Sequence, residues 1–292
     1  MEAITVENLT KYYGKNRGIE GVNLSVPEGE IFGFIGPNGA GKTTTIRLLL
    51  GLIFPTSGKA SIFGKDCIKY GKEIRKEVGY IPGEVNFYPD ATVEDFLKYA
   101  ASFYENVDEE YTRMLCKELS VETKKKFREL SMGNKKKVAV VQALMHRPKL
   151  LILDEPTNGL DPLIQKLLFE FLKEEKERGA TVFFSSHILS EVERLCDRVA
   201  MIKDGRIFKV EKIDDLRKER YKVVRVRPKN PEVLKEIVSN TTEEGNGVFR
   251  FMYTGSTNEL LQKLSRIEIE DLWIDDPSLE EIFMSYYREG KS

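Results

Sequence analysis

Runs of apolar residues along this chain alternate with segments of helical periodicity. Residues 4–27 alternate between apolar and polar side chains, which is typical of antiparallel strands with one buried face. Ile31–Ile35 and Leu150–Leu153 are apolar almost throughout, as in strands that are buried on both faces of a parallel sheet. Thr44–Leu50, which follows the first of these strands, has the composition of a helix. These patterns predict an α/β core with an antiparallel β subdomain.

Two helical regions and a hairpin complete the predicted core. Residues 84–147 are mainly helical in pattern, with Thr92 and Asp95 spaced as a capping pair, and we expect a helical subdomain inserted into the core. A further helix begins at Asp161–Pro162. The turn Lys203–Arg206 closes a hairpin at the edge of the core. The apolar residues of the further helix that are expected to face the sheet are Leu163, Leu167, Leu168, Phe171 and Leu172.

The periodicity restarts at Tyr221, so the predicted domains are residues 1–220 and residues 221–292. The expected strands of the second domain are residues 221–227, 247–253 and 267–273, and the expected helices begin at residues 231, 258 and 276. This βαβαβα order predicts a small α+β accessory domain of about seventy residues. Lys222, Arg225 and Arg227 share one face of the first strand, where cross-strand partners are favoured over a bound anion.

Residues Gly36–Thr43 read Gly-Pro-Asn-Gly-Ala-Gly-Lys-Thr and lie between a buried strand and a helix. The glycines allow the backbone to turn tightly, so that bare N–H groups at a helix N-terminus face phosphate oxygens. Lys42 is expected to reach the β- and γ-phosphates of ATP or GTP, and the Thr43 hydroxyl to ligate magnesium. An ordinary glycine turn would not fill every fixed position of this motif. The predicted nucleotide-binding residues are Gly36, Pro37, Asn38, Gly39, Ala40, Gly41, Lys42, Thr43 and Thr44.

The second buried strand ends in two adjacent carboxylates, Asp154 and Glu155. Ligands of parallel α/β sheets lie at the carboxyl ends of the strands, so both side chains are expected beside the phosphate loop. We expect Asp154 to hold the magnesium shell and Glu155 to polarise the attacking water. The alternative, that the two carboxylates only cap the next helix, is disfavoured by the phosphate loop upstream.

Two other segments carry weaker signals of phosphate contact. Ser131 and Gly133 open a predicted helix in a position suited to an anion, although taken alone a simple Ser N-cap is the better interpretation. His187 ends the β-rich run Phe183–Ser186, one helix after the carboxylates, as a γ-phosphate contact should. A lone histidine is more often structural, so each signal depends on the others.

Taken together, these motifs resemble the ATP-binding subunits of ABC transporters. The resemblance covers about the first 210 residues, because the motifs follow one another in the order and spacing of that family. Tyr13 resembles the aromatic residue that stacks on adenine, although one residue of the Tyr12–Tyr13 pair is open to a plain packing role. The matching segments are Gly36–Thr43, Leu130–Asn134, Leu153–Pro156, Asn158–Asp161 and His187.

The resemblance implies that two nucleotide domains face each other head to tail. Each ATP is then bound by the phosphate loop of one copy and the signature segment of the other. Ser131, Gly133 and Asn134 are accordingly expected to act in trans, and Asp161 to communicate across the interface. Catalysis is assigned to Glu155, His187 and Lys42.

Two departures from the family pattern affect the expected mechanism. Where the family usually has a glutamine that contacts magnesium and water, this chain has Gly83. The side chain that couples nucleotide state to the helical subdomain is therefore missing, and Glu84 is the neighbour in sequence that is close enough to substitute. Met132 and Asn134 replace the usual glycine and glutamine of the signature. The serine and glycine expected to touch the γ-phosphate are retained, so hydrolysis is expected to survive.

Composition and charge restrict the function. The 292-residue chain has 46 basic and 47 acidic residues and a net charge of −1, which gives no overall attraction to nucleic acid or to an anionic membrane. The basic runs Lys124–Lys126 and Lys135–Lys137 are expected to be solvated faces. The three cysteines include no Cys-x-x-Cys pair, which indicates reduced thiols without a metal site. No signal peptide or transmembrane helix is expected, so another chain must supply a membrane path.

We therefore expect an ATP-hydrolysing motor subunit that uses ATP and Mg²⁺ at the cytoplasmic face of a membrane. Its expected partners are a second copy of itself or a paralogous ATPase subunit, and an integral membrane permease. Pro277–Phe283 resembles the C-terminal extension of ABC-2-type exporter ATPases, which serve antibiotics, drugs, lipids or polysaccharides. The alternative, a soluble ABC ATPase acting on ribosomes or nucleic acid, usually has two sets of motifs or a long coiled-coil insertion. A third alternative is a non-hydrolysing regulatory subunit, which would be expected to lack the catalytic carboxylate or the γ-phosphate histidine. This chain has both, as Glu155 and His187.

Overall fold

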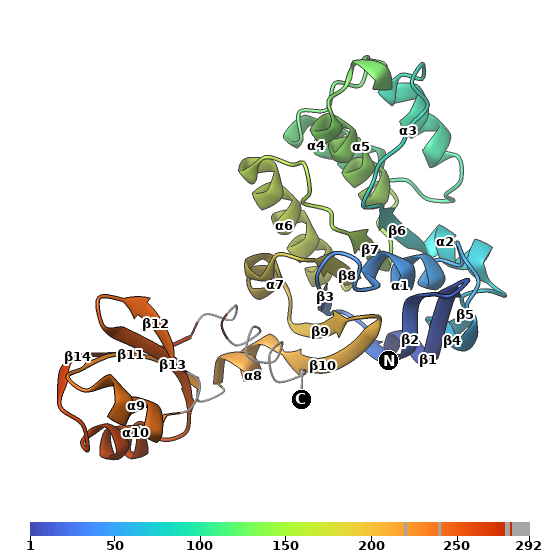
Figure 1. Ribbon diagram of the computed structural model, residues 1–292. Coiled ribbons are helices and arrows are strands. Elements are labelled where there is room, and N and C mark those ends of the chain that lie inside the picture. Colours follow the sequence, from blue (N-terminus) through green and yellow to red (C-terminus); the bar gives the residue numbers. More distant parts are fainter. Residues whose placement is uncertain (219–220, 239–240, 278–280, 282–292) are drawn as a thin grey trace. The chain divides into compact units, whose positions relative to one another are not determined.

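The computed structural model describes residues 1–218, 221–238, 241–277 and 281. These residues form two compact units that divide between Ile213 and Asp214 (Figure 1). The short helix α8 (Ile213–Lys218) lies at this division. The boundary predicted from the sequence is Tyr221, where the first strand of the second unit begins.

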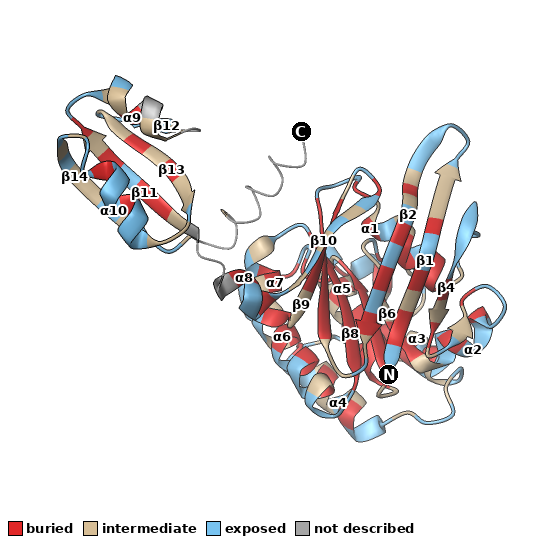
Figure 2. Cartoon of the chain, turned by 90° about the horizontal axis from the view of Figure 1, so that it is seen from below, coloured by how far each residue is buried: buried red, intermediate tan, exposed pale blue. Residues whose placement is uncertain are grey.

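A six-stranded sheet in the order β10-β9-β3-β8-β7-β6 forms the core of the first unit. The strands from β9 to β6 are parallel, and β10 joins β9 in antiparallel orientation. Strands β3, β7 and β8 are buried along their whole length (Figure 2), as expected for the centre of a parallel sheet. The bounds are β3 (Ile31–Ile35), β6 (Val78–Ile81), β7 (Leu150–Asp154), β8 (Thr181–Ser186), β9 (Arg198–Lys203) and β10 (Arg206–Lys212). The predicted α/β core is confirmed.

An antiparallel sheet in the order β2-β1-β4-β5 packs against this core. Its strands are β1 (Glu2–Tyr13), β2 (Asn16–Pro27), β4 (Ser57–Ile62) and β5 (Lys65–Asp66). Ile4 and Val26 point inward and share one hydrophobic cluster with Phe32 of β3 and Ile46 of helix α1 (Lys42–Leu49). The alternation seen in the sequence therefore marks the buried face of this sheet, as predicted.

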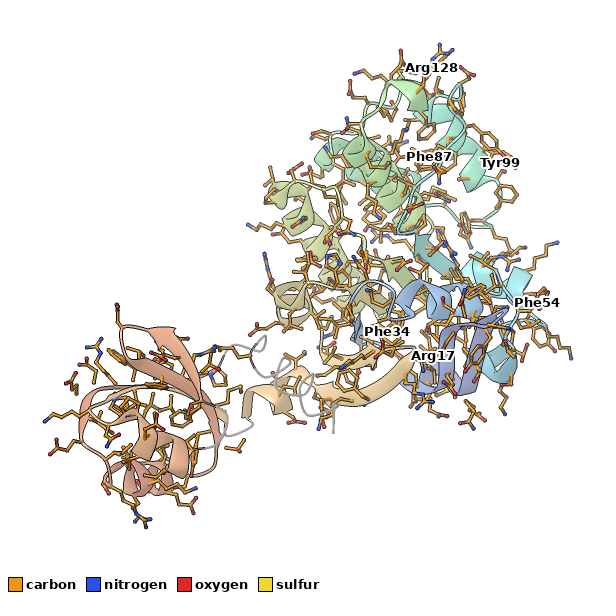
Figure 3. All side chains as sticks on the ribbon, viewed as in Figure 1. Arg17, Phe34, Phe54, Phe87, Tyr99 and Arg128 are labelled. Atoms are coloured by element: carbon orange, nitrogen blue, oxygen red, sulfur yellow. The ribbon has the colours of Figure 1, made fainter. Side chains whose placement is uncertain are left out.

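Between β6 and β7 the chain forms a helical subdomain. Thr92 caps α3 as predicted, because its hydroxyl accepts a 3.1 Å hydrogen bond from the N–H of Asp95. Phe87, Phe96 and Phe127 pack ring against ring inside the subdomain, whereas Tyr99 lies at its outer surface (Figure 3). The bounds are α3 (Val93–Ala101), α4 (Glu109–Glu118), the 3₁₀ helix η1 (Phe127–Glu129) and α5 (Met132–Leu144), and α2 (Gly71–Glu77) precedes β6.

The two basic runs of this subdomain differ. Lys124 is exposed and lies 2.5 Å from a carboxylate oxygen of Glu94, so this run is the solvated face that was expected. The expectation is wrong for the run Lys135–Lys137, because only 2% of Lys136 is exposed. Helix α5 packs against β6, and the residue on that face of the helix is buried whatever its type.

Helix α6 (Pro162–Glu177) begins at Asp161, whose carboxylate accepts hydrogen bonds from the N–H groups of Leu163 and Ile164 at 3.1 Å. The buried apolar residues include Leu168, Phe171 and Leu172, as predicted. The prediction is wrong for Leu163, which is 67% exposed, because Ile164 occupies the inward position of the first turn.

The remaining elements of the first unit are helix α7 (Leu189–Leu195), which follows β8, and the β9–β10 hairpin. Asp204 and Gly205 form the hairpin turn with φ angles of 47° and 75°, which is the conformation that two-residue hairpins favour. The predicted turn is confirmed. Across the described residues of both units, no helix combines the length and apolar character needed to cross a membrane.

The second unit is an antiparallel sheet in the order β12-β13-β11-β14, with helices α9 and α10. Its chain order is βαββαβ, and this order and sheet topology are those of a ferredoxin-like domain. The predicted βαβαβα order missed β12 (Thr242–Gly245), which is exposed at every residue. The predicted final helix lies largely outside the described residues. The other bounds are β11 (Tyr221–Pro228), α9 (Pro231–Ile237), β13 (Val248–Thr254), α10 (Thr257–Leu264) and β14 (Ile269–Asp275).

The basic residues of β11 have acidic partners on or beside the neighbouring strand. Arg225 donates to Asp275 at 2.7 Å, and Lys222 and Arg227 pair with Asp276 and Asp271 in the same way. The expected cross-strand partners are thus confirmed, and these cations are already neutralised within the sheet.

Candidate functional site

An open cleft with a volume of about 520 Å³ lies at the carboxyl ends of β3 and β7, where ligands of parallel sheets bind. It brings together three segments that are far apart in the sequence: the phosphate loop, the end of β7 and the turn after β6. Its lining residues are Tyr13, Arg17, Gly18, Asn38, Gly39, Gly41, Lys42, Thr43, Thr44, Gly83, Glu84, Asp154, Glu155 and Asn158. Of the predicted phosphate-loop residues, Gly36, Pro37 and Ala40 do not line it.

The phosphate loop folds around the side chain of Lys42. This residue is 5% exposed, and its ammonium group donates to the carbonyl oxygens of Gly36 and Pro37 at 2.7 and 3.1 Å. Gly41 precedes helix α1 with a φ of 109°, a conformation that glycine adopts without strain. A Cβ atom at Gly36 would lie 2.3 Å from the carbonyl oxygen of Ile202 on β9. The loop therefore requires glycine at these positions for close packing as well as for its turn.

Glu155 lies at the centre of a network of polar side chains. One carboxylate oxygen is 3.1 Å from the ammonium group of Lys42, and the other accepts from the Asn158 amide at 2.6 Å and lies 3.2 Å from Nδ1 of His187. Partial burial raises the pKa of this carboxyl, but the hydrogen bond and charge of Lys42, aided by His187 and Asn158, outweigh burial, so the pKa is lowered overall. Glu155 is therefore held ionised, the state that a general base requires.

The backbone around Glu155 is also strained. Its φ is 46°, which is uncommon for a residue with a side chain. Its N–H group points to β8, lying 3.1 Å from the hydroxyl and 3.2 Å from the carbonyl oxygen of Ser185. These bonds hold the strained residue in place, so the direction of the Glu155 side chain is set by the edge of the sheet.

Asp154 is 1% exposed, and its Oδ1 accepts a 2.8 Å hydrogen bond from the Ser185 hydroxyl. Oδ2 is turned toward Gly83, where a Cβ atom would approach it to 3.3 Å. Thr43 is exposed and lines the same cleft. A carboxylate and a hydroxyl are hard oxygen donors, and magnesium is commonly bound by one or two such protein ligands together with substrate phosphates. The residues present therefore fit a magnesium site that is completed by a nucleotide.

At the far end of the cleft, Tyr13 is 46% exposed and presents its ring to the lining. A Cβ atom at Gly18 would lie 2.9 Å from the Tyr13 ring, so the ring packs directly on the backbone there. Tyr12 is half-buried and is absent from the lining, so Tyr13 is the member of the pair that faces the cleft. Arg17 and Gly18 were missed by the sequence analysis, since only tertiary packing brings their turn to this site.

The signature residues are not part of this cleft within the described chain. Ser131 caps helix α5 by accepting a 3.3 Å hydrogen bond from the N–H of Asn134. A Cβ atom at Gly133 would lie 2.7 Å from the carbonyl oxygen of Gly159. The start of α5 is thus packed against the segment that leads to Asp161. This neighbourhood agrees with the expectation that both segments face a second nucleotide domain.

Gly83 and Glu84 line the cleft beside Asp154. Glu84 is exposed, and the polar contacts of Glu155 described above do not include it. Gly83 lies so close to the Asp154 carboxylate that a side chain here would press on it. The backbone of the turn after β6 therefore lies beside Asp154, a predicted magnesium ligand.

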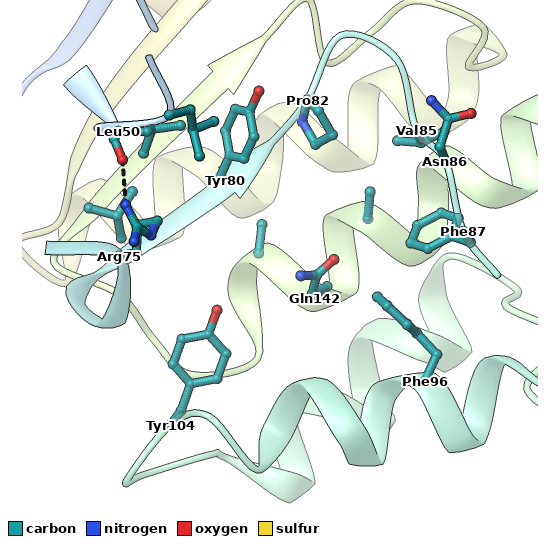
Figure 4. A pocket seen from close by; sticks show the side chains of 14 residues that line it. Leu50, Arg75, Tyr80, Pro82, Val85, Asn86, Phe87, Phe96, Tyr104 and Gln142 are labelled. Carbon is teal, nitrogen blue, oxygen red and sulfur yellow. Dashed lines mark hydrogen bonds between the residues drawn. The ribbon is translucent and has the colours of Figure 1, made fainter. Parts of the chain in front are cut away.

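A second hollow of about 360 Å³ lies between the sheet and the helical subdomain (Figure 4). Arg75 closes one end of it by donating to the carbonyl oxygen of Leu50 at 2.9 Å. Pro82, the residue before Gly83, belongs to its wall, so the turn after β6 separates the two cavities. The other lining residues are Leu52, Val78, Tyr80, Val85, Asn86, Phe87, Phe96, Tyr104, Ala139, Gln142 and Ala143.

Comparison with known proteins supports the reading of these motifs. A sequence profile described as ABC transporter matches residues 19–158. The bacitracin transport ATP-binding protein BcrA of Bacillus licheniformis is 43% identical over 75% of this chain and 72% of its own length. The Nod factor export ATP-binding protein I of Rhizobium etli is 32% identical over 97% of this chain and 93% of its own length. A dimeric post-hydrolysis structure of the ATP-binding cassette MJ0796 with ADP and phosphate is 25% identical, with a TM-score of 0.65 over 72% of this chain and 98% of that one.

Proposed function

Since this chain belongs to the family of ABC transporter ATP-binding subunits, we propose that it is the motor subunit of an exporter and drives a separate membrane permease. Members of this family bind and hydrolyse ATP. The observation that carries the proposal is the meeting of Lys42, Asp154 and Glu155 in one cleft. Each has the chemical character that phosphoryl transfer to water needs.

Catalysis follows from the charges around Glu155. When the γ-phosphate enters the loop, the ammonium group of Lys42 turns from Glu155 toward the phosphate oxygens, where it offsets the charge that develops in the transition state. Glu155 then faces the attacking water and accepts its proton. His187, which lies 3.2 Å from Glu155, contacts the γ-phosphate and keeps the water aligned.

Thr43 and Asp154 would hold a magnesium ion, which would supply positive charge against the phosphate oxygens. The Ser185 hydroxyl fixes Oδ1 of Asp154, which leaves Oδ2 directed toward the cleft and Gly83. This orientation lets the carboxylate act without a change of rotamer.

The second half of each nucleotide site comes from a second copy of the chain or from a paralogous ATPase subunit. Ser131 and Gly133 are outside the cleft of their own chain, yet they stand at the N-terminus of a 13-residue helix, a suitable place for a phosphate. Gly133 packs on Gly159, and we propose that the signature and the segment that leads to Asp161 form one surface. A dimer related by a two-fold axis pairs this surface with the phosphate loop of the other chain.

The permease is proposed to dock at the second hollow (Figure 4). Phe87 and Phe96 provide apolar walls, and Leu52, Tyr88 and Tyr99 are large apolar residues exposed on the same part of the chain. The shared turn at Pro82 gives a route from this hollow to the nucleotide. The proposed export direction follows the relative from Rhizobium etli, whose name describes Nod factor export.

Steady-state hydrolysis of ATP by the purified chain, alone and with its permease in lipid vesicles, tests this function. We expect magnesium-dependent release of phosphate, with a stimulation by the permease that Lys42→Ala abolishes. Hydrolysis that is absent in wild type under both conditions would reject the proposal.

A further inference from the structure

Lys136 is the one lysine of the signature helix that is withdrawn from solvent. It is 2% exposed, whereas Lys135 and Lys137 on either side are half-buried. Its ammonium group donates to the carbonyl oxygen of Pro82 at 2.8 Å and to that of Gly83 at 3.1 Å. An unpaired ammonium group is very costly to bury, so these contacts are required wherever the charge is retained.

The two carbonyl groups belong to the turn that separates the nucleotide cleft from the second hollow. Pro82 lines the hollow, and Gly83 lines the nucleotide cleft beside Asp154. Strand β6, which leads into the turn, pairs with β7 up to Ile81 and Leu153. Beyond that pair the turn leaves the sheet, and the two bonds from Lys136 attach it to α5.

Burial and the nearby carboxylates act on the charge of Lys136 in opposite directions. Burial lowers the pKa of Lys136 to about 8, and the negative charges of Asp154 and Glu155 oppose this effect. The ammonium group therefore lies within the field of the catalytic carboxylates. Its position is defined by geometry, since two directed hydrogen bonds fix it to the turn.

Gly83 offers no side chain with which to report the state of the nucleotide. A Cβ atom there would already lie 3.3 Å from Oδ2 of Asp154, so the backbone occupies the space next to the carboxylate. Any movement of this turn changes the setting of Asp154 directly. Helix α5 carries Lys136 near its start, four residues after the helix begins at Met132.

We infer that Lys136 is a positioning residue, which ties the Pro82–Gly83 turn to helix α5 and so transmits movement of the helical subdomain to Asp154. This inference deepens the proposed coupling between nucleotide and permease, and it rests on that function. Gly83 has no side chain that could connect the turn to the helical subdomain. Lys136 makes this connection through the backbone carbonyl groups of the turn. The hydrogen bonds of Lys136 go to the turn and not to the proposed magnesium ligands, so its effect on those ligands is indirect.

The test compares Lys136→Met with wild type, and with Lys117→Met as the matched control. Methionine has a similar length and volume but no N–H donor, and Lys117 is an exposed lysine on α4 of the same subdomain. We expect Lys136→Met to lower kcat by about 10-fold or more, with an ATP KM within about threefold of wild type, because only positioning is lost. Hydrogen exchange of residues 81–87 without nucleotide should become faster in Lys136→Met and stay unchanged in Lys117→Met.

Lys136→Gln distinguishes a tether from a purely structural contact. The glutamine amide keeps an N–H donor. We therefore expect both the hydrogen-exchange rate of residues 81–87 and kcat to lie between the values for wild type and those for Lys136→Met. If Lys136→Met does not fold, the glutamine variant alone carries the test. Unchanged exchange at residues 81–87, or faster exchange with unchanged kcat, overturns the inference. Wild-type inactivity with and without the permease would instead reject the proposed function.

Discussion

The ammonium group of Lys42 lies 3.1 Å from a carboxylate oxygen of Glu155, so the proposed phosphate ligand and the proposed general base form an ion pair. The nearly buried ammonium group also donates to the Gly36 and Pro37 carbonyl oxygens, so that all three of these partners are oxygen acceptors. We expect the γ-phosphate to replace Glu155 as the anion beside Lys42 and thereby to release Glu155 for the attacking water.

The trans arrangement is tested by mixing two inactive chains. Ser131→Arg should damage the signature half of a site, and Lys42→Ala should damage the phosphate-loop half. Random pairing makes half of the dimers mixed, each with one intact site, so the mixture should recover up to about a quarter of wild-type ATPase activity. Three equally inactive samples would count against sites shared between chains. Circular dichroism of Ser131→Arg controls for loss of the α5 cap.

Adenine stacking is expected to depend on Tyr13 rather than on Tyr12. Tyr13→Ala should weaken ATP binding by about three- to tenfold, because an aromatic stacking contact contributes about 0.5–1.5 kcal/mol. Tyr12→Ala, which removes a half-buried ring outside the cleft, is the control. Titration with a fluorescent ATP analogue measures both. Equal losses in the two variants would show that neither ring is specific to the base.

Glu84 is the other residue that stands beside the missing glutamine position. If its carboxylate approaches the nucleotide when the dimer closes, Glu84→Ala should lower hydrolysis, or its stimulation by the permease, more than it lowers ATP affinity. Steady-state ATPase activity with and without the permease measures this. Identical values for Glu84→Ala and wild type in both conditions would make Glu84 a surface residue. Coupling would then run through the backbone of the turn, the route in which Lys136 takes part.

His146 should make the first unit sensitive to acid. It stacks on Tyr104 with a ring separation of 3.7 Å, and burial lowers its pKa to about 4. The unfolded chain binds a proton at this residue below about pH 6.5 while the folded chain does not, so stability is lost as the pH falls from about 6.5 toward 4. Between pH 7.5 and pH 5, this residue should cost about 1–2 kcal/mol of unfolding free energy.

Urea denaturation of wild type and His146→Phe at both pH values checks this expectation. Phenylalanine keeps an aromatic partner for Tyr104 but has no proton to bind, so the variant should lose less stability than wild type on acidification. An equal loss in both proteins would assign the acid sensitivity to other groups.

The parts of this fold that the sequence predicts are those in which local pattern and packing agree. The continuous apolar run of Leu150–Leu153 predicts a buried strand, and the glycine spacing of Gly36–Thr43 predicts a phosphate loop. The structure shows both. All residues of strand β12 are exposed, so its sequence shows no alternation of apolar and polar residues. The strand is defined by its pairing with β13, which the local sequence does not reveal. Leu163 and Ile164 are equally apolar neighbours, and only the orientation of the first turn of α6 decides which is buried.

The same distinction holds within the site. Asp154 and Glu155 were predictable because adjacent carboxylates at a strand end share one edge of the sheet. Lys136 was not, because a run of three lysines normally indicates solvent, and its burial depends on the approach of β6 and the turn after it. Gly18 likewise becomes part of the cleft only through the ring of Tyr13. Residues whose role depends on contacts between distant segments leave no local signal in the sequence.

The central claim, that Glu155 is the general base of an ATPase, is tested most directly by ATP turnover of Glu155→Gln. Glutamine preserves the size of the side chain but accepts no proton from water. The account predicts that kcat falls by about 100-fold or more while ATP binding is kept, and that an ATP-bound dimer accumulates on size exclusion. Turnover close to that of wild type would contradict it.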